Sequence, residues 1–163
     1  MAETPRDAVL YVNVRSRRGA AWFRRSAEAL QASGIVLREA RGFRKPRNLL
    51  LAVKRAARED RVPLIVVGGG DGTLSRSLDA LLESGLPLGI LPLGNANDLA
   101  RTLQIPTNLE AACGIIGEGN ARPIDVGQIE RANVPPTHFF NVASIGLSVR
   151  IAKRLTPDRK QKW

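Results

Sequence analysis

The 163-residue chain contains one cysteine and one histidine, and aromatic residues make up only 4% of it. A single cysteine, Cys113, excludes a disulfide bond within the chain and fits a reducing compartment. No window approaches the roughly 18 consecutive apolar residues of a transmembrane helix. The start of the chain also lacks the apolar core of a signal peptide. These absences predict a cytoplasmic protein with no membrane-spanning segment.

Two common phosphate-binding motifs and a nucleic-acid platform are missing as well. No Gly-Lys-Ser or Gly-Lys-Thr occurs, which excludes a P-loop, and Thr73 stands where a dinucleotide fingerprint needs its last glycine. Four Phe, two Trp and one Tyr are too few to stack a single-stranded nucleic acid, and no nucleic-acid-binding motif is recognised. We therefore expect no nucleic-acid partner.

Positive charge is abundant, at a net +10, but it is unevenly distributed. Residues 1–61 carry fifteen Lys/Arg against six acids and residues 150–163 carry six against one, whereas residues 62–149 carry four against eight. Such basic flanks suit an anionic membrane surface, to which the protein would bind peripherally. An arginine-rich surface that contacts only solvent would give the same counts.

Apolar runs and amphipathic stretches alternate along the first 122 residues, as in a βαβ protein. From about residue 123 the pattern changes to strand-like stretches over 124–129 and 138–144, joined by a turn at Pro135-Pro136. The sequence predicts a three-layer α/β/α nucleotide-binding domain with a mainly parallel sheet over residues 1–122. Residues 123–163 are predicted to begin a truncated β-rich domain with a basic tail. The expected strands of the first domain cover residues 8–13, 35–38, 64–67 and 88–91.

The run from Leu64 to Thr73 carries the strongest chemical signal. Four apolar residues are followed by Gly68-Gly69-Gly70-Asp71-Gly72-Thr73, which predicts a buried strand, a glycine turn and a helix capped by Thr73 and starting at Leu74. Unpaired N–H groups and the helix dipole make such a turn an anion site. The carboxylate of Asp71 suggests a divalent cation between protein and phosphate. A tight βα connection without a ligand is the simpler alternative.

A second glycine turn follows the next predicted strand. Pro92 ends that strand, Gly94 permits a turn, and Asn97 and Asp98 precede a short helix. Because parallel strands end at the same edge of a sheet, both turns are expected to face one crevice. Asp71 and Asp98 would then lie close together, and two carboxylates without a nearby lysine favour Mg²⁺. An ordinary helix N-cap is the alternative role of Asp98.

The order of these blocks resembles the diacylglycerol kinase catalytic domain family, which includes bacterial lipid kinases and sphingosine kinases. Gly-Gly-Asp-Gly-Thr is shared with NAD kinases, but the string Pro-Leu-Gly-Asn-Ala-Asn-Asp at 92–98 is similar to the second signature of the lipid kinases. Residues 12–19 are loosely similar to the family's first-strand block, and residues 124–127 and 140–146 look like its next two blocks. The resemblance covers only the N-terminal half of the family's usual protein, whose second domain holds much of the lipid pocket.

The resemblance implies an ATP- and Mg²⁺-dependent kinase that transfers a γ-phosphate to a diacylglycerol-like lipid hydroxyl at a membrane surface, as in phospholipid biosynthesis, and that often forms a homodimer. Asp71 and Asp98 are the expected catalytic residues, and Asp125 joins them as an expected metal ligand. The chain departs from the family pattern at Val14, at Asn95 and in the stretch Ser75-Arg76-Ser77-Leu78-Asp79, where relatives often have Asn-Glu and then Asn. The expected nucleotide-binding residues are Asn13, Gly69, Gly70, Gly72, Thr73, Gly94, Asn95 and Asn97.

Two other functions fit the same residues. One is a soluble kinase of the NAD kinase type, and the other is a non-catalytic module that binds nucleotide or an anionic membrane. Arg101 is the nearest cation to the second motif, although a helix-surface arginine would look the same. Thr107 and Glu110 have the spacing of a capping box, which predicts that Thr107 caps a helix through Ile116. Cys113 is predicted to be a buried residue of this helix, and His138 a core or edge residue of a strand.

Overall fold

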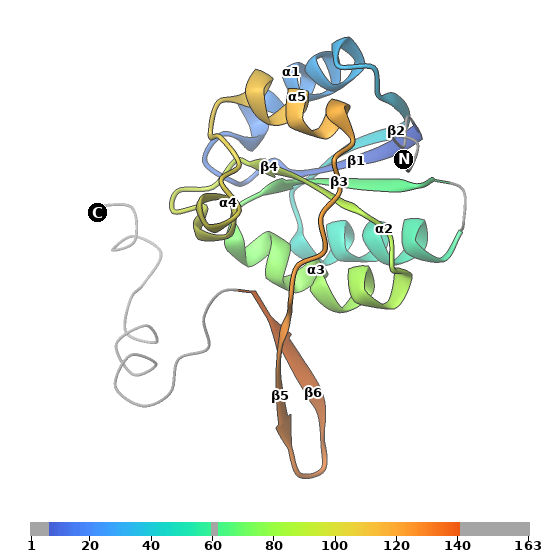
Figure 1. The fold of residues 1–163 in the computed structure, drawn as a ribbon, viewed down its shortest axis with the longest axis vertical. Helices are drawn as coiled ribbons and strands as arrows, with labels where there is room; N and C mark the ends of the chain where they lie inside the picture. The colour runs from blue at the N-terminus through green and yellow to red at the C-terminus, as the bar shows by residue number, and fades with distance from the viewer. Residues whose placement is uncertain (1–6, 60–61, 141–163) are drawn as a thin grey trace.

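A four-stranded parallel sheet between two layers of helices forms the body of the protein (Figure 1). The structure is a computed structural model that describes residues 7–59 and 62–140. The strand order is β2-β1-β3-β4, which confirms the predicted α/β class. The strands are β1 Asp7–Asn13, β2 Val36–Phe43, β3 Leu64–Gly69 and β4 Leu88–Pro92. The helices are α1 Gly19–Ala32, α2 Pro46–Arg58, α3 Asp71–Ser84, α4 Asp98–Thr102 and α5 Leu109–Glu118.

Strand β1 lies inside the sheet and shows how the two faces are built. Because side chains alternate along a strand, Val9 and Tyr11 pack in one apolar cluster, whereas Leu10 and Val12 pack in another. The first cluster includes residues of α2 and α3, and the second includes residues of α1 and α5. Figure 1 shows these helix pairs on opposite faces of the sheet. All six residues of β3 are buried, as its unbroken apolar sequence predicts.

A polar network ties β1 to the edge strand and to α2. The hydroxyl of Tyr11 donates to Glu39 at 2.8 Å, and Arg55 donates to both carboxylate oxygens of Glu39 at 2.8 and 2.9 Å. The phenol is fully buried. Burial, together with the hydrogen bond to Glu39, raises the pKa of Tyr11 to about 12.

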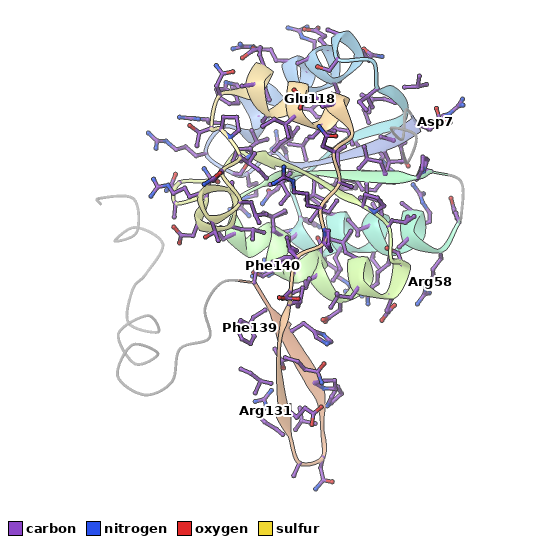
Figure 2. The ribbon with its side chains drawn as sticks, viewed as in Figure 1. Asp7, Arg58, Glu118, Arg131, Phe139 and Phe140 are labelled. Atoms are coloured by element: carbon purple, nitrogen blue, oxygen red, sulfur yellow. The ribbon has the colours of Figure 1, made fainter. Side chains whose placement is uncertain are left out.

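A two-stranded hairpin, β5 Gly127–Arg131 and β6 Val134–Phe139, projects from the body (Figures 1 and 2). Its turn lies at Ala132-Asn133, where Asn133 has φ +59°, so the predicted turn at Pro135-Pro136 is wrong. Both prolines lie within β6. This strand belongs to a two-stranded sheet, so its outer edge pairs with no other strand and proline, which has no backbone N–H, is tolerated there. The hairpin confirms that β structure follows the α/β body. The predicted strand over 138–144 extends outside the described residues.

Three local predictions need correction. Helix α3 begins at Asp71 with Gly70 as its N-cap, so Thr73 lies inside the first turn and does not cap it. Helix α5 is capped by Asn108, whose side-chain oxygen accepts from the N–H of Ala111 at 2.9 Å, rather than by Thr107. Strand β2 extends to Phe43, beyond the predicted end at Arg38, because it pairs along all of β1.

Two predictions about single residues are confirmed. Cys113 is fully buried on α5, and burial, with a smaller effect of Glu110, raises the pKa of its thiol to about 11. His138 lies on β6, with its ring nitrogens 2.9 Å from Asp79 and 3.1 Å from Gln128. Within the ranges that the structure describes, no helix is long and apolar enough to cross a bilayer.

Candidate functional site

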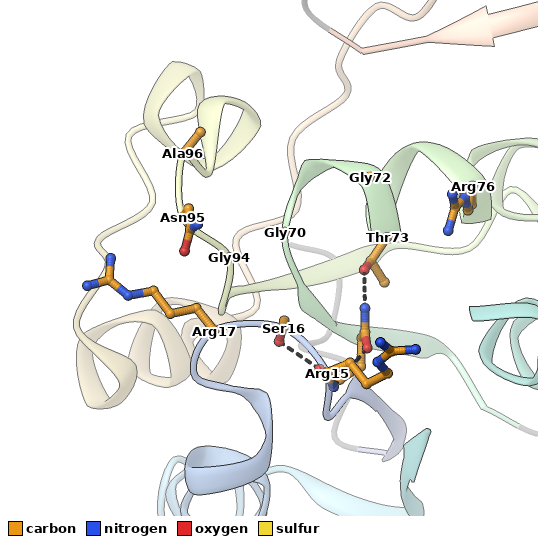
Figure 3. Close-up of a pocket in the computed structure, with 11 residues that line it drawn as sticks. Arg15, Ser16, Arg17, Gly70, Gly72, Thr73, Arg76, Gly94, Asn95 and Ala96 are labelled. Carbon is orange, nitrogen blue, oxygen red and sulfur yellow. Dashed lines mark hydrogen bonds between the residues drawn. The ribbon is translucent and has the colours of Figure 1, made fainter. Parts of the chain in front are cut away.

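A cleft of about 980 Å³ opens at the carboxyl ends of β1, β3 and β4 (Figure 3). The chain continues from β1 to β2 on one side and later returns to place β3 on the other side of β1, so the cleft lies where the strand order reverses. Ligands of open α/β sheets bind at such switch points. The cleft is lined by Asn13, Arg15, Ser16, Arg17, Gly70, Gly72, Thr73, Arg76, Gly94, Asn95 and Ala96.

The loop after β1 is folded around the side chain of Asn13. Its carbonyl oxygen Oδ1 accepts from the N–H of Arg15 at 3.0 Å, and its amide Nδ2 donates to the hydroxyl of Thr73 at 3.0 Å. Its backbone carbonyl accepts from the hydroxyl of Ser16 at 2.6 Å. Asn13 therefore joins β1 to the first turn of α3 and orders the loop after β1. Figure 3 shows Arg15 and Arg17 on this loop.

The two glycine turns meet, as the sequence predicts. A Cβ on Gly94 would lie only 2.5 Å from Cα of Gly70, so backbone approaches backbone here without room for a side chain. A Cβ on Gly69 would lie 2.7 Å from the Thr73 hydroxyl, and the Gly69 carbonyl accepts from the N–H of Leu93 at 2.9 Å. Gly69 thus serves packing and does not line the cleft. Around Gly72 a Cβ would meet nothing within 4 Å, which leaves space for a ligand.

The turn between β4 and α4 is held by Asn97. This residue is 5% exposed and has φ +51°, a conformation that asparagine tolerates better than most residues. Its side chain accepts from the N–H of Gly94 at 2.9 Å and donates to the Gly94 carbonyl at 3.1 Å. Asn97 therefore shapes the loop, and Asn95, not Asn97, lines the cleft.

The three predicted metal ligands do not form one cluster. Asp71 lies between two lining residues, and its Oδ1 accepts from the N–H of Leu99 at 3.0 Å, which caps α4. Asp98 directly precedes Leu99, so the backbones that carry these two aspartates are close. Asp125 is exposed on the segment before β5 and is not a lining residue. Among residues 7–59 and 62–140, no three acidic, histidine or cysteine side chains gather where they could hold a metal ion.

Three arginines on the cleft wall were not predicted as site residues: Arg15, Arg17 and Arg76. The first two follow β1 and the third lies one turn into α3. Their signal in the sequence is position: each comes shortly after a strand whose carboxyl end faces the same edge. Guanidinium groups bind phosphate through several N–H donors, so the wall fits a phosphorylated ligand.

Comparison with known proteins agrees with this geometry. The family model described as the diacylglycerol kinase catalytic domain matches residues 7–129. The chain belongs to this family. The matched span includes both glycine turns, the arginine-bearing loop and the start of the hairpin.

Individual relatives carry the same kind of name. "Probable lipid kinase YegS-like" of Klebsiella pneumoniae is 39% identical over 100 residues, which are 60% of this chain and 32% of that protein. "Probable lipid kinase YegS" of Escherichia fergusonii is 39% identical over 107 residues, which are 63% and 34% of the two chains. A diacylglycerol kinase crystal structure from Bacillus anthracis superposes with a TM-score of 0.65 at 27% identity, over 75% of this chain and 43% of that one. The chain spans about a third of the length of these curated relatives.

Proposed function

We propose that this chain is the nucleotide-binding part of a lipid kinase that transfers the γ-phosphate of ATP to a lipid hydroxyl, such as that of diacylglycerol. The observation that carries the proposal is the cleft at the switch point, where the N-terminus of a 14-residue helix and three arginines face one space. The family match and the names of the relatives support a kinase.

In this proposal the chain binds and orients the phosphates. The first-turn N–H groups of α3 at Asp71 and Gly72 are donors without an intrahelical acceptor, and the Thr73 hydroxyl adds a third donor. Arg15, Arg17 and Arg76 hold phosphate oxygens, while Gly94 and Asn95 close the opposite wall. Phosphoryl transfer depends mostly on such positioning and on charge stabilisation.

The donor set fits Mg²⁺ in one specific way. Proteins often hold this ion through one or two carboxylates together with substrate phosphates, so an all-protein cluster is not required. Asp71 and Asp98 fit this mode; Oδ2 of Asp71 has no protein partner within the described ranges. When bound, the ion would neutralise charge on the phosphates. Asp125 keeps its proposed role as an outer ligand only if the hairpin segment approaches the nucleotide.

The test is transfer of labelled γ-phosphate from ATP into mixed lipid vesicles by the full chain, with Asp71→Asn as the matched variant. The asparagine oxygen can still accept from the N–H of Leu99, so α4 stays capped. We expect wild-type labelling of lipid and a loss of about 100-fold or more in the variant, since metal ions contribute several kcal/mol to such transfers.

Two results would contradict the proposal. Equal labelling by Asp71→Asn would remove the carboxylate from the mechanism. Labelling of added NAD but not of lipid would assign the chain to a soluble NAD kinase activity instead. If nothing is labelled although ATP binds, the transfer activity does not reside in this chain alone.

A further inference from the structure

Arg18 ends the arginine-bearing loop after β1 and lies outside the cleft that this loop lines. It is the N-cap residue of α1, and its backbone N–H donates to the carbonyl of Leu93 at 3.2 Å. Leu93 directly precedes Gly94, which lines the cleft. The backbone bond of Arg18 therefore joins the loop after β1 to the second glycine turn.

The side chain of Arg18 is held by two further parts of the chain. Its guanidinium group lies over the ring of Trp22 in the first turn of α1, with Cζ 4.8 Å from the ring centroid. Its Nη1 donates to the backbone carbonyl of Thr107, in the loop before α5, at 3.3 Å. Tryptophan attracts a cation more strongly than the other aromatic residues do. These contacts anchor the end of the cleft loop to α1 and to the segment that leads into α5.

A second arginine makes the same ring contact without belonging to the loop. Cζ of Arg25 lies 5.8 Å from the centroid of the Trp22 ring, and its guanidinium group pairs with Glu110 in the first turn of α5. Helices α1 and α5 lie side by side (Figure 1). Trp22 therefore contacts one arginine that joins the two helices to each other and another, Arg18, that joins them to the cleft loop.

The loop between β1 and α1 is short and tightly turned. The N–H of Ser16 donates to the carbonyl of Asn13 at 3.0 Å, and the N–H of Gly19 donates to the carbonyl of Ser16 at 3.1 Å. A Cβ on Gly19 would lie 2.1 Å from the carbonyl oxygen of Asn13, so backbone packs closely on backbone where α1 begins. Because the loop is this compact, a displacement at Arg18 also displaces the arginines that line the cleft.

We propose that Arg18 is a positioning residue for nucleotide binding. Anchored on Trp22 and on the carbonyl of Thr107, it holds the arginine-bearing loop after β1 against the second glycine turn. The guanidinium groups of this loop then meet the phosphates in a fixed geometry, although Arg18 does not contact the ligand. The proposal rests on the function proposed above, because it takes a nucleotide as the ligand of the cleft.

The test is calorimetric titration of ATP, with Mg²⁺ present, into the full chain and three variants. We expect Arg18→Met to weaken ATP binding by roughly tenfold, because methionine keeps an apolar contact with Trp22 but has no charge and no N–H donor. Arg18→Lys should bind within about threefold of the wild type, since its ammonium group can lie over the ring and donate to the carbonyl of Thr107. Arg25→Met is the matched control. It removes the other guanidinium group from the same ring and breaks the ion pair with Glu110, yet it leaves the loop unchanged, so its affinity should equal that of the wild type.

Hydrogen exchange reports on the loop itself. The backbone N–H groups of Arg15 and Ser16 donate to the side-chain and backbone oxygens of Asn13, respectively. In the absence of ATP these two amides should exchange faster in Arg18→Met than in Arg25→Met. A general loss of stability would speed exchange equally in both variants.

Equal ATP affinities of Arg18→Met and the wild type would overturn the inference and leave the proposed function standing. Equal losses in Arg18→Met and Arg25→Met, or an Arg18→Met chain without a cooperative urea transition, would also overturn it, because the contact would then only stabilise the fold. A loss in Arg18→Lys as large as that in Arg18→Met would show that the two anchors do not hold the loop. No ATP binding by the wild type would overturn both the inference and the proposed function.

Discussion

Tyr11 is a buried residue whose ionisation the fold opposes. It is the sole tyrosine of the chain, so tyrosinate absorbance reports this site alone. We expect an absorbance midpoint near pH 12 in the folded protein, against about 10 in urea, because burial and the hydrogen bond to Glu39 raise the pKa of Tyr11 to about 12.

The same residue makes stability depend on alkaline pH. A folded-state pKa above the unfolded value contributes stability that is complete below about pH 10 and is lost as pH rises toward 12. Urea unfolding at several pH values should show this decline, on the order of 2–3 kcal/mol, and Tyr11→Phe should remove it. The separate decline between about pH 9 and 11 that comes from the raised pKa of Cys113 should remain in the variant. A Tyr11→Phe protein with an unchanged alkaline decline would contradict the assignment.

At the scale of single residues, the sequence predicts where the cleft lies but not the role of each side chain. Six of the residues predicted to bind nucleotide line the cleft: Asn13, Gly70, Gly72, Thr73, Gly94 and Asn95. Asn97 and Gly69 serve the loops instead. Asn97 bonds to Gly94, three residues before it, and Gly69 contacts Thr73, four residues after it, while its carbonyl accepts from the N–H of Leu93. The bond to Leu93 depends on how the two turns meet in space, and no local pattern contains that information.

At the scale of elements, substitutions in the two glycine turns can distinguish an effect on folding stability from an effect on ligand binding. Gly94→Ala places a Cβ against the backbone of Gly70 and should force the turns apart, which lowers the free energy of unfolding and weakens ATP binding together. Gly72→Ala meets open space in the first turn of α3. It should stabilise the fold by up to about 1 kcal/mol and still weaken ATP binding, because its methyl group enters the ligand's space.

The measurements are urea unfolding and ATP titration of both variants. A Gly72→Ala protein with undiminished ATP affinity would argue that phosphates do not approach this turn.

The alternation of β and α patterns in the sequence predicts the strands and helices of the α/β body, but it does not predict where each element ends. The cap of α5 shifted from Thr107 to Asn108 because both residue types can cap, and only the loop geometry selects one of them.

For the whole molecule, the body carries its core without the hairpin. Every fully buried apolar side chain among the described residues lies between Ala8 and Cys113. From the hairpin region, Phe140 packs partly against the cluster on the α2 and α3 side, and the His138–Asp79 contact is largely exposed at Asp79. The predicted boundary at residue 122 therefore falls outside the core.

A chain shortened to residues 1–122 should still unfold cooperatively in urea. We expect its free energy of unfolding to fall by about 1–2 kcal/mol, which corresponds to the loss of part of one aromatic contact. A shortened chain without a cooperative transition would show that the hairpin region belongs to the same folding unit and that the boundary is wrong.

The central place of β1 also bears on how the chain is made. Residues 7–13 are synthesised before both of their partners, since one edge of this strand pairs with residues 36–43 and the other with residues 64–68. Until those partners have been synthesised, an apolar strand with open hydrogen-bonding edges is exposed in the nascent chain, the state in which unpaired strands associate with other chains. We therefore expect chaperones that cover apolar segments to matter most in the interval before residues 64–68 have been synthesised.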